Sequence, residues 1–261
     1  RNLTWNVIAN FDKSKSTVIS LPADLPETYN SDTWLYGNVR NGTSAGKSTR
    51  ALTGNFYMRN KNGDILVDPS SGLPIRHTTF IDAGYDRQPD WTMGLTNSVT
   101  LGRARFSMLW DIRKGGDIMN ATEHFLTTRG LSPRTLDREK MQTIQGVLRD
   151  GLENTDKPTR NTIAVSTEAY YGTMSEELFI EKDINWLRLR DVTVDFRLPE
   201  RFGRSSVFVS GTDLLLFTNY SGLDPIVNGN TAAVGGSGSV GLDFGNFPMP
   251  RGINFGIKTA F

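Results

Sequence analysis

The chain has 261 residues, which is long enough for one large β domain or two ordinary domains. Its 29 Lys and Arg residues balance 28 Asp and Glu residues, and this net charge of +1 excludes a general electrostatic attraction to nucleic acid or anionic lipid. The absence of cysteine excludes disulfide bonds, a thiolate nucleophile and a cysteine-based zinc site.

Hydropathy restricts the possible relation to membranes. The first residues, RNLTWNVIAN, lack the basic stretch and apolar core of a signal peptide, so we expect any export signal to lie upstream of this chain. No window approaches the roughly 20 consecutive apolar residues of a membrane-spanning helix. A membrane β-barrel stays possible, because its strands alternate lipid-facing and lumen-facing residues and keep the mean hydropathy moderate.

Period-two patterns predict strands in the first half of the chain. Apolar residues alternate with polar ones from Leu3 to Phe11, and a further candidate strand spans Ser48 to Met58. The clearest strand is WTMGLTNSVTLG, which a short turn at Gly102 to Arg105 joins to FSMLWDIRK. Its apolar face carries Trp91, Met93, Leu95, Val99 and Leu101. About ten residues per strand is the length of a tilted bilayer-crossing strand.

Three more strands are predicted in the second half. INWLRLRDVTVDFRLP alternates but changes phase between Leu189 and Val192, which indicates a β-bulge or a change of environment. SSVFVSGTDLLLFT follows after a short polar link. In the last strand, Gly252 to Phe261, the apolar face carries Ile253, Phe255, Ile257 and Phe261. The total is about seven strands.

The connections between these strands are very unequal in length. The long ones are Arg59 to Asp90, Gly115 to Asp183 and Asn219 to Pro250. In the second, Ser132 as N-cap and Pro133 at the first helical position predict a short helix. Alternating short turns and long loops are typical of an outer-membrane barrel. A soluble β-sandwich or barrel stays open as an alternative, because period-two strands are common to both.

No arrangement for catalysis or metal binding stands out. The two histidines, His77 and His124, are 47 positions apart and lie outside any carboxylate-rich motif. AGKST resembles the end of a phosphate-binding loop, but its spacing to Gly42 is one residue short and no strand or helix pattern flanks it. The aromatic residues are not interleaved with a basic patch, as nucleic-acid binding requires. We therefore expect no enzyme activity, no metal, no cofactor and no nucleic-acid partner.

Three spaced motifs near the end of the chain resemble the C-terminal end of the SusC/RagA family of TonB-dependent outer-membrane transporters of Bacteroidetes. They are INWLRLRDVTVDFRLP, VFVSGTDLLLFTNYSGLDPIVN and GLDFGNFPMPRGINFGIKTAF, in the order of the family. The family positions include Gly211, Asp213, Leu214, Asp224, Pro225, Asp243, Gly245, Pro248, Pro250 and Arg251. Asp213 departs from the family, which more often has Asn. GNFYMRNKNGDILVDPSSGLP and RKGGDIMNAT match more loosely.

The resemblance implies the C-terminal portion of a 22-stranded antiparallel transmembrane β-barrel, with long external loops of which one contains a short helix. Residues 1–261 would all belong to this barrel, with the plug domain and TonB box absent from the chain. The rest of the barrel would be another part of the same protein or another chain, since open strand edges are not tolerated in lipid.

The implied function is TonB-dependent import of oligosaccharides or peptides with a SusD-like lipoprotein. The partners would be this lipoprotein, the remaining barrel and plug, TonB and outer-membrane lipid. Phe261 would be the C-terminal assembly signal. Two alternatives are a structural outer-membrane barrel and a soluble carbohydrate-binding module that exposes loop aromatics, namely Trp34, Tyr36, Tyr170 and Tyr171.

Overall fold

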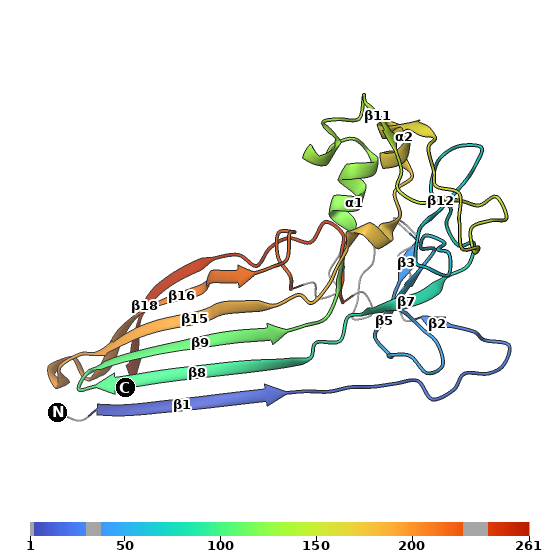
Figure 1. Cartoon of the computed structure of the whole chain (residues 1–261). Helices are drawn as coiled ribbons and strands as arrows, with labels where there is room; N and C mark the ends of the chain where they lie inside the picture. Colours follow the sequence, from blue (N-terminus) through green and yellow to red (C-terminus); the bar gives the residue numbers. More distant parts are fainter. Residues whose placement is uncertain (1–2, 30–37, 227–239, 261) are drawn as a thin grey trace.

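The computed structural model describes residues 3–29, 38–226 and 240–260. Its main element is a six-stranded antiparallel sheet in the order β1-β8-β9-β15-β16-β18. The strands are β1 (Leu3–Asp12), β8 (Trp91–Leu101), β9 (Ala104–Lys114), β15 (Trp186–Arg197), β16 (Arg204–Thr218) and β18 (Gly252–Ala260). These six are the predicted strands, apart from Ser48 to Met58, and they form one open, curved wall (Figure 1).

The two ends of this wall differ. The short links, Gly102–Arg103 and residues 198–203, lie at the same end of the wall as Leu3 of β1 and Ala260 of β18 (Figure 1). Gly102 has a φ of +60°. It occupies the first position of a two-residue turn, where glycine is favoured because such hairpins need a left-handed residue. Every long connection therefore leaves the opposite end of the wall, in agreement with the alternation of short turns and long loops in the sequence.

The described parts of the three long connections, 13–90, 115–185 and 219–251, pack together beyond the wall, and we call them the loop layer. Its strands are β2 (Thr28–Tyr29), β3 (Val39–Arg40), β4 (Gly42–Thr43), β5 (Ala51–Gly54), β6 (Leu66–Val67), β7 (Ile81–Asp86), β10 (Ile118–Asn120), β11 (Met141–Thr143), β12 (Val147–Leu148), β13 (Ala164–Ser166), β14 (Ile180–Glu181) and β17 (Leu242–Asp243). Its helices are α1 (Ala121–Thr128) and α2 (Thr167–Gly172), with 3₁₀ turns at Pro133–Thr135 and Glu176–Phe179. A further 3₁₀ turn, Glu200–Phe202, lies in the short β15–β16 link.

The buried core of the molecule lies in the loop layer. Its main apolar cluster joins residues of all three long connections, namely Val39, Leu52, Phe56, Tyr85, Met119, Met174, Phe179, Ile180 and Leu242. A smaller cluster of Ile118, Ile184 and Tyr220 packs against Trp186 at the beginning of β15. Because apolar burial is the main stabilising contribution in folding, these clusters hold the three connections against one another and against the wall.

Two expectations from the sequence were wrong. The candidate strand Ser48 to Met58 is not part of the wall: only β5 forms there, between β3 and β7 in the loop layer. The helix expected after Ser132 is a single 3₁₀ turn, although Ser132 Oγ does accept the Arg134 N–H at 3.2 Å. Leu136 and Met141, which lie in the segment after this turn, are exposed, so apolar contacts there do not support a longer helix.

Candidate functional site: a two-faced sheet and its loop layer

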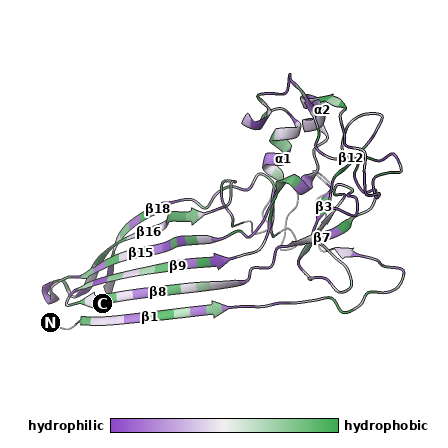
Figure 2. Cartoon of the chain, in the orientation of Figure 1, coloured by the Kyte–Doolittle hydropathy of each residue, from purple (hydrophilic) through white to green (hydrophobic). Residues whose placement is uncertain are grey.

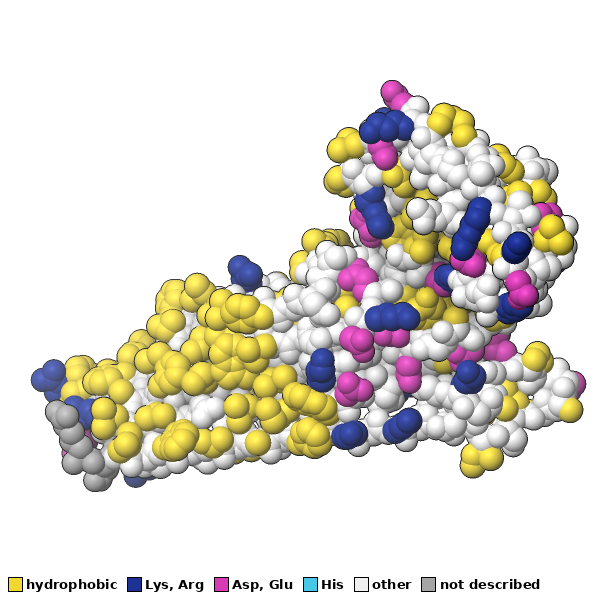
Figure 3. All heavy atoms as spheres, viewed as in Figure 1, with side chains coloured by type: hydrophobic (Ala, Val, Ile, Leu, Met, Phe, Trp, Pro, Cys, Tyr) yellow, Lys and Arg dark blue, Asp and Glu magenta, His cyan; other side chains and the backbone are white. Residues whose placement is uncertain are grey.

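One face of the wall, which we call the apolar face, is hydrophobic across all six strands. A single row of directly paired residues runs from β1 to β18 and consists of Trp5, Val99, Phe106, Val194, Val209 and Phe255. Figure 3 shows hydrophobic side chains gathered over this part of the sheet, and in Figure 2 hydrophobic residues recur along these strands. Asn97 also lies on this face, where its Oδ1 accepts the Trp5 indole N–H at 3.3 Å.

The predicted membrane-facing residues all lie on the apolar face. They are Trp91, Met93, Leu95, Val99 and Leu101 of β8 and Ile253, Phe255 and Ile257 of β18. The three β18 residues are 73–84% exposed. Apolar side chains this exposed and this contiguous mark a surface that another apolar phase or partner covers. Contact with lipid stays a prediction for these residues, and Phe261 lies outside the described residues.

The opposite face, which we call the polar face, carries the residues that alternate with those of the apolar face along each strand. The neighbouring row consists of Asn6, Ser98, Ser107, Thr193, Ser210 and Asn254, all polar. Nearer the short turns, Asp195 accepts a hydrogen bond from Ser206 Oγ at 3.0 Å and lies 3.6 Å from Lys258 Nζ. A cavity of about 480 Å³ on this face is lined by Arg103, Arg105 and Arg197 among other residues. The wall therefore has one apolar face and one hydrophilic face.

The phase change in β15 is a β-bulge. The register shifts between Leu189 and Asp191 against both β9 and β16. As a result Leu187 and Leu189 share the apolar face with Val192 and Val194, although their sequence parity differs. Of the two explanations that the sequence left open, the bulge is the observed one.

Opposite this bulge, a buried cation binds two carboxylates of the family motif. Arg188 is 2% exposed, and its guanidinium donates to Asp213 Oδ1 at 3.3 Å and to Asp224 Oδ1. Asp213 has a φ of +50°, which explains the Asn or Asp at this motif position because both tolerate left-handed backbone. Asp224 Oδ2 also accepts the Met249 N–H at 3.0 Å. The cluster fastens the ends of β15 and β16 to the chain that leads into β18.

A second motif carboxylate lies deeper in the loop layer. Asp243 accepts hydrogen bonds from the Tyr220 hydroxyl and from Thr122 Oγ1, the latter at 3.3 Å. Burial raises the pKa of Asp243, and the Tyr220 bond opposes this increase. Gly245, at a φ of +66°, donates its N–H to Thr122 Oγ1 at 2.8 Å. These motif residues connect loops and make no catalytic arrangement.

The other motif positions have simpler surroundings. A Cβ atom on Gly211 would lie 2.5 Å from Leu214 Cδ1, so only glycine lets Leu214 fold back over this position. Pro225 is buried beside Asp224, whereas Pro248, Pro250 and Arg251 are exposed in the segment that precedes β18. Two prolines there keep the segment extended and out of the strand ladder.

Two successive glutamates of the loop layer connect different long connections. Glu176 accepts hydrogen bonds from the Asn38 N–H at 3.1 Å and from Arg76 Nη1 at 3.0 Å. Glu177 accepts from the Tyr57 N–H at 3.0 Å and from Arg59 Nη2 at 2.9 Å. Both carboxylates belong to residues 115–185, and all four donors belong to residues 13–90. The sequence alone does not indicate this structural role, because the partners lie 100 to 138 residues away along the chain.

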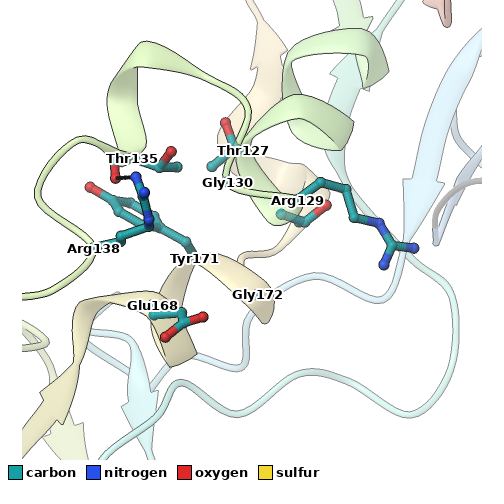
Figure 4. A pocket seen from close by; sticks show the side chains of 9 residues that line it. Thr127, Arg129, Gly130, Thr135, Arg138, Glu168, Tyr171 and Gly172 are labelled. Atoms are coloured by element: carbon teal, nitrogen blue, oxygen red, sulfur yellow. Dashed lines mark hydrogen bonds between the residues drawn. The ribbon is translucent and has the colours of Figure 1, made fainter.

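The outer end of the loop layer contains a polar cavity of about 430 Å³ between α1 and α2 (Figure 4). Thr127, Arg138, Glu168 and Tyr171 line it with hydrogen-bonding groups. Tyr171 is held in place, since its hydroxyl donates to Asp137 Oδ1 at 2.7 Å. Such a lining suits hydrogen bonding to a hydrophilic ligand.

Tyr170 and Tyr171 are only half exposed, because both pack on the main apolar cluster. They are therefore less available for stacking on a sugar than the carbohydrate-binding alternative requires. Trp34 and Tyr36 lie outside the described residues.

Among the described residues, no three His, Asp or Glu side chains form a group that could hold a metal ion. In the same residues, no helix is long and apolar enough to cross a membrane.

Comparison with known proteins identifies relatives of much greater length. No family model matches the chain. It is 23% identical over 291 residues to TonB-dependent receptor P3 of Formosa agariphila, covering 100% of this chain and 27% of that protein. It is also 23% identical over 220 residues to TonB-dependent receptor P26 of the same organism, covering 80% of this chain and 20% of that protein.

Solved structures share the fold. The RagAB peptide transporter matches with a TM-score of 0.56 at 14% identity, covering 98% of this chain and 27% of that chain. The RagAB peptide importer in its open-open state matches with a TM-score of 0.56 at 15% identity, covering 97% and 26%. The chain thus spans about a quarter of these proteins. The resemblance drawn from the three motifs is confirmed: the chain is similar in sequence to TonB-dependent receptors and shares its fold with a part of the RagAB structures.

Proposed function

We propose that the protein to which this chain belongs imports nutrients across the outer membrane of a Gram-negative bacterium of the Bacteroidetes, driven through TonB. The observation that carries the proposal is the pair of adjacent rows across the wall, one entirely apolar from Trp5 to Phe255 and one entirely polar from Asn6 to Asn254. A bilayer-crossing barrel wall needs this division, because one face meets lipid and the other a wet lumen.

In this proposal residues 1–261 supply barrel strands and external loops. The loop layer lies outside the cell, and the links at Gly102 to Arg105 and Glu200 to Ser205 lie in the periplasm. The open edges of β1 and β18 pair with the remaining barrel, because unpaired strand edges are not tolerated in lipid. The plug domain and the TonB-contacting segment belong to the rest of the receptor.

The cargo is a peptide or an oligosaccharide, and a SusD-like lipoprotein covers the loop layer. The names of the solved relatives support peptide import, since both are RagAB peptide transporters. The polar cavity between α1 and α2 supports a hydrophilic cargo or partner at the external end. This function requires no catalytic residue in the chain.

Membrane fractionation and an uptake assay test the proposal. After carbonate washing, the intact receptor should stay with the membranes and need detergent for release, whereas a soluble carbohydrate-binding module would be washed off. Cells without the receptor, or treated with an uncoupler of the proton gradient, should lose uptake of labelled oligopeptides or oligosaccharides. A membrane-bound receptor whose deletion leaves uptake of both cargo classes unchanged would instead support a structural barrel.

A further inference from the structure

The margin of the apolar face next to the loop layer carries a tryptophan between two lysines. Trp91 of β8 pairs directly with Lys114 of β9. On the other side, Asp12 is the last residue of β1 and pairs with Thr92, so Lys13 comes next to Trp91. Trp91 and Lys114 thus lie side by side on neighbouring strands, and Lys13 follows directly after the last paired residue of the third strand, β1.

All three side chains belong to the apolar face. The rings of Phe11 and Trp91 are stacked with centroids 5.9 Å apart, which places both on one face. Lys114 shares the face of its partner Trp91. Lys13 is the first residue after β1, and continuing the alternation of the strand by one residue assigns it to the face of Phe11. The adjacent cation Arg113 belongs to the other face, where its Nη2 donates to the Arg87 carbonyl at 2.9 Å.

Both lysines are exposed and available for a partner. Within residues 3–29, 38–226 and 240–260, neither Lys13 nor Lys114 makes an ion pair with an acidic side chain. The carboxylate nearest in sequence to Trp91 is that of Asp90, which lies against Gly115: a Cβ atom there would be 2.7 Å from Asp90 Oδ2. Among the described residues, the two ammonium groups therefore have no acidic side chain as an ion-pair partner.

These three residues lie where hydrophobic side chains give way to charged ones. Figure 3 shows that the hydrophobic surface of the strands ends at the base of the loop layer, where Lys, Arg, Asp and Glu side chains begin. Tryptophan favours such a boundary, because its ring is apolar and its N–H is polar. Lysine stems can lie along apolar surface while their ammonium groups extend into the polar layer.

We infer that Lys13, Trp91 and Lys114 form a binding site for the anionic, phosphate-bearing headgroup of an outer-membrane lipid. The inference rests on the proposed function, because it requires the apolar face to be in a bilayer. Two strand spacings separate the lysines by roughly 10 Å, so their flexible side chains can reach one headgroup from both sides. A phosphate between two ammonium groups gains charge-assisted hydrogen bonds, while the indole packs on the lipid below.

Lipid retention by the full-length receptor tests the site. The receptor is placed in nanodiscs of equal phosphatidylglycerol and phosphatidylcholine, and retained lipids are counted by native mass spectrometry after mild detergent release. We expect wild type to retain phosphatidylglycerol preferentially. The double variant Lys13→Ala/Lys114→Ala should lose this preference, by roughly five-fold for each lysine. The matched control is Lys47→Ala/Lys157→Ala, which removes two exposed lysines of the loop layer.

The outcomes separate this site from the proposed function. Loss of the preference in the double variant but not in the control supports the site. Equal loss in both variants, or equal retention of the two lipids by wild type, overturns it. A receptor that does not enter nanodiscs at all contradicts the proposed function itself.

Discussion

The burial of Arg188 could not be predicted from the sequence. Period-two alternation in INWLRLRD assigns this arginine to a polar strand face, and nothing in the local pattern indicates that it is almost fully buried. Its partners Asp213 and Asp224 were identified, but only through resemblance to a family motif. The structure explains why the arginine and the carboxylates occur together. Removing one member of a buried ion pair leaves an uncompensated charge, at a typical cost of about 3–5 kcal/mol.

His124 allows a prediction about pH. Its ring lies in the loop layer, where Nε2 is 3.1 Å from the Met174 carbonyl and 3.8 Å from Glu176 Oε1. Burial lowers the pKa of His124 below 6.5, and Glu176 only partly opposes this. Since the unfolded chain then binds a proton that the folded chain excludes, stability should fall as pH falls below about 6.5, by at most ~1.4 kcal/mol per pH unit.

The melting temperature of the purified receptor between pH 7.5 and pH 5 measures this effect. His124→Gln should reduce the loss of stability on acidification, since the titrating group is gone. His77→Gln is the matched control, because the hydrogen bonds of His77 to Phe56 and Asn55 use only its backbone. An unchanged pH profile in His124→Gln would show that other groups dominate the acid response.

Among the elements, β15 was predicted more fully than the loop-layer helices. The alternation in its sequence predicted the strand, and the change of parity indicated either a β-bulge or a change of environment, because both signals depend on local spacing. The helix predicted after Ser132 does not form, because helix formation there depends on tertiary contacts and not only on local spacing. Cap residues and apolar spacing are local, but a short helix forms only where a tertiary surface buries its apolar face. The observed α1 finds such a surface in β17 and the 3₁₀ turn at Glu176–Phe179.

Glu177 should hold two of the long connections together. Its carboxylate accepts the Tyr57 N–H, Arg59 Nη2 and, at 3.4 Å, the Tyr85 hydroxyl. Burial, followed by this neighbouring negative charge, raises the pKa of Tyr85 to about 12. Glu177→Ala leaves a buried backbone donor and a cation without their acceptor. It should therefore destabilise the local structure by about 1.5–3 kcal/mol, the contribution of hydrogen bonds to a charged group.

Amide hydrogen exchange of the intact receptor provides the measurement. The Tyr57 amide should exchange about ten-fold faster or more in Glu177→Ala, because its acceptor is lost and opening becomes easier. Glu153→Ala is the control, since within the described part of the chain the Glu153 side chain accepts a hydrogen bond only from the nearby Gly151 N–H, at 2.7 Å. Equal protection of Tyr57 in Glu177→Ala and wild type would show that the apolar cluster alone joins the two connections.

At the scale of the whole molecule, the sequence predicted the wall better than the loop layer. Alternation and loop length can be read from one sequence. They predict the strand positions, the strand directions and the end of the wall from which the long connections leave. The packing of three connections around Phe56, Met119 and Leu242 depends on contacts between distant segments, which no local pattern encodes. The same limit explains why the polar cavity between α1 and α2 was not predicted.

Lysine substitutions on the two faces of β8 test whether the apolar face contacts lipid. Leu95 lies on this face near the middle of β8, and Thr96 points to the polar face one residue away. A lysine at the bilayer midplane costs a barrel about 2–4 kcal/mol on the lipid side, whereas a wet lumen tolerates it. In the full-length receptor, Leu95→Lys should therefore reduce the amount of folded, heat-modifiable barrel in the outer membrane far more than Thr96→Lys. Equal yields of the two variants would contradict a lipid-facing role for the apolar face, because position in the strand and inserted charge are matched.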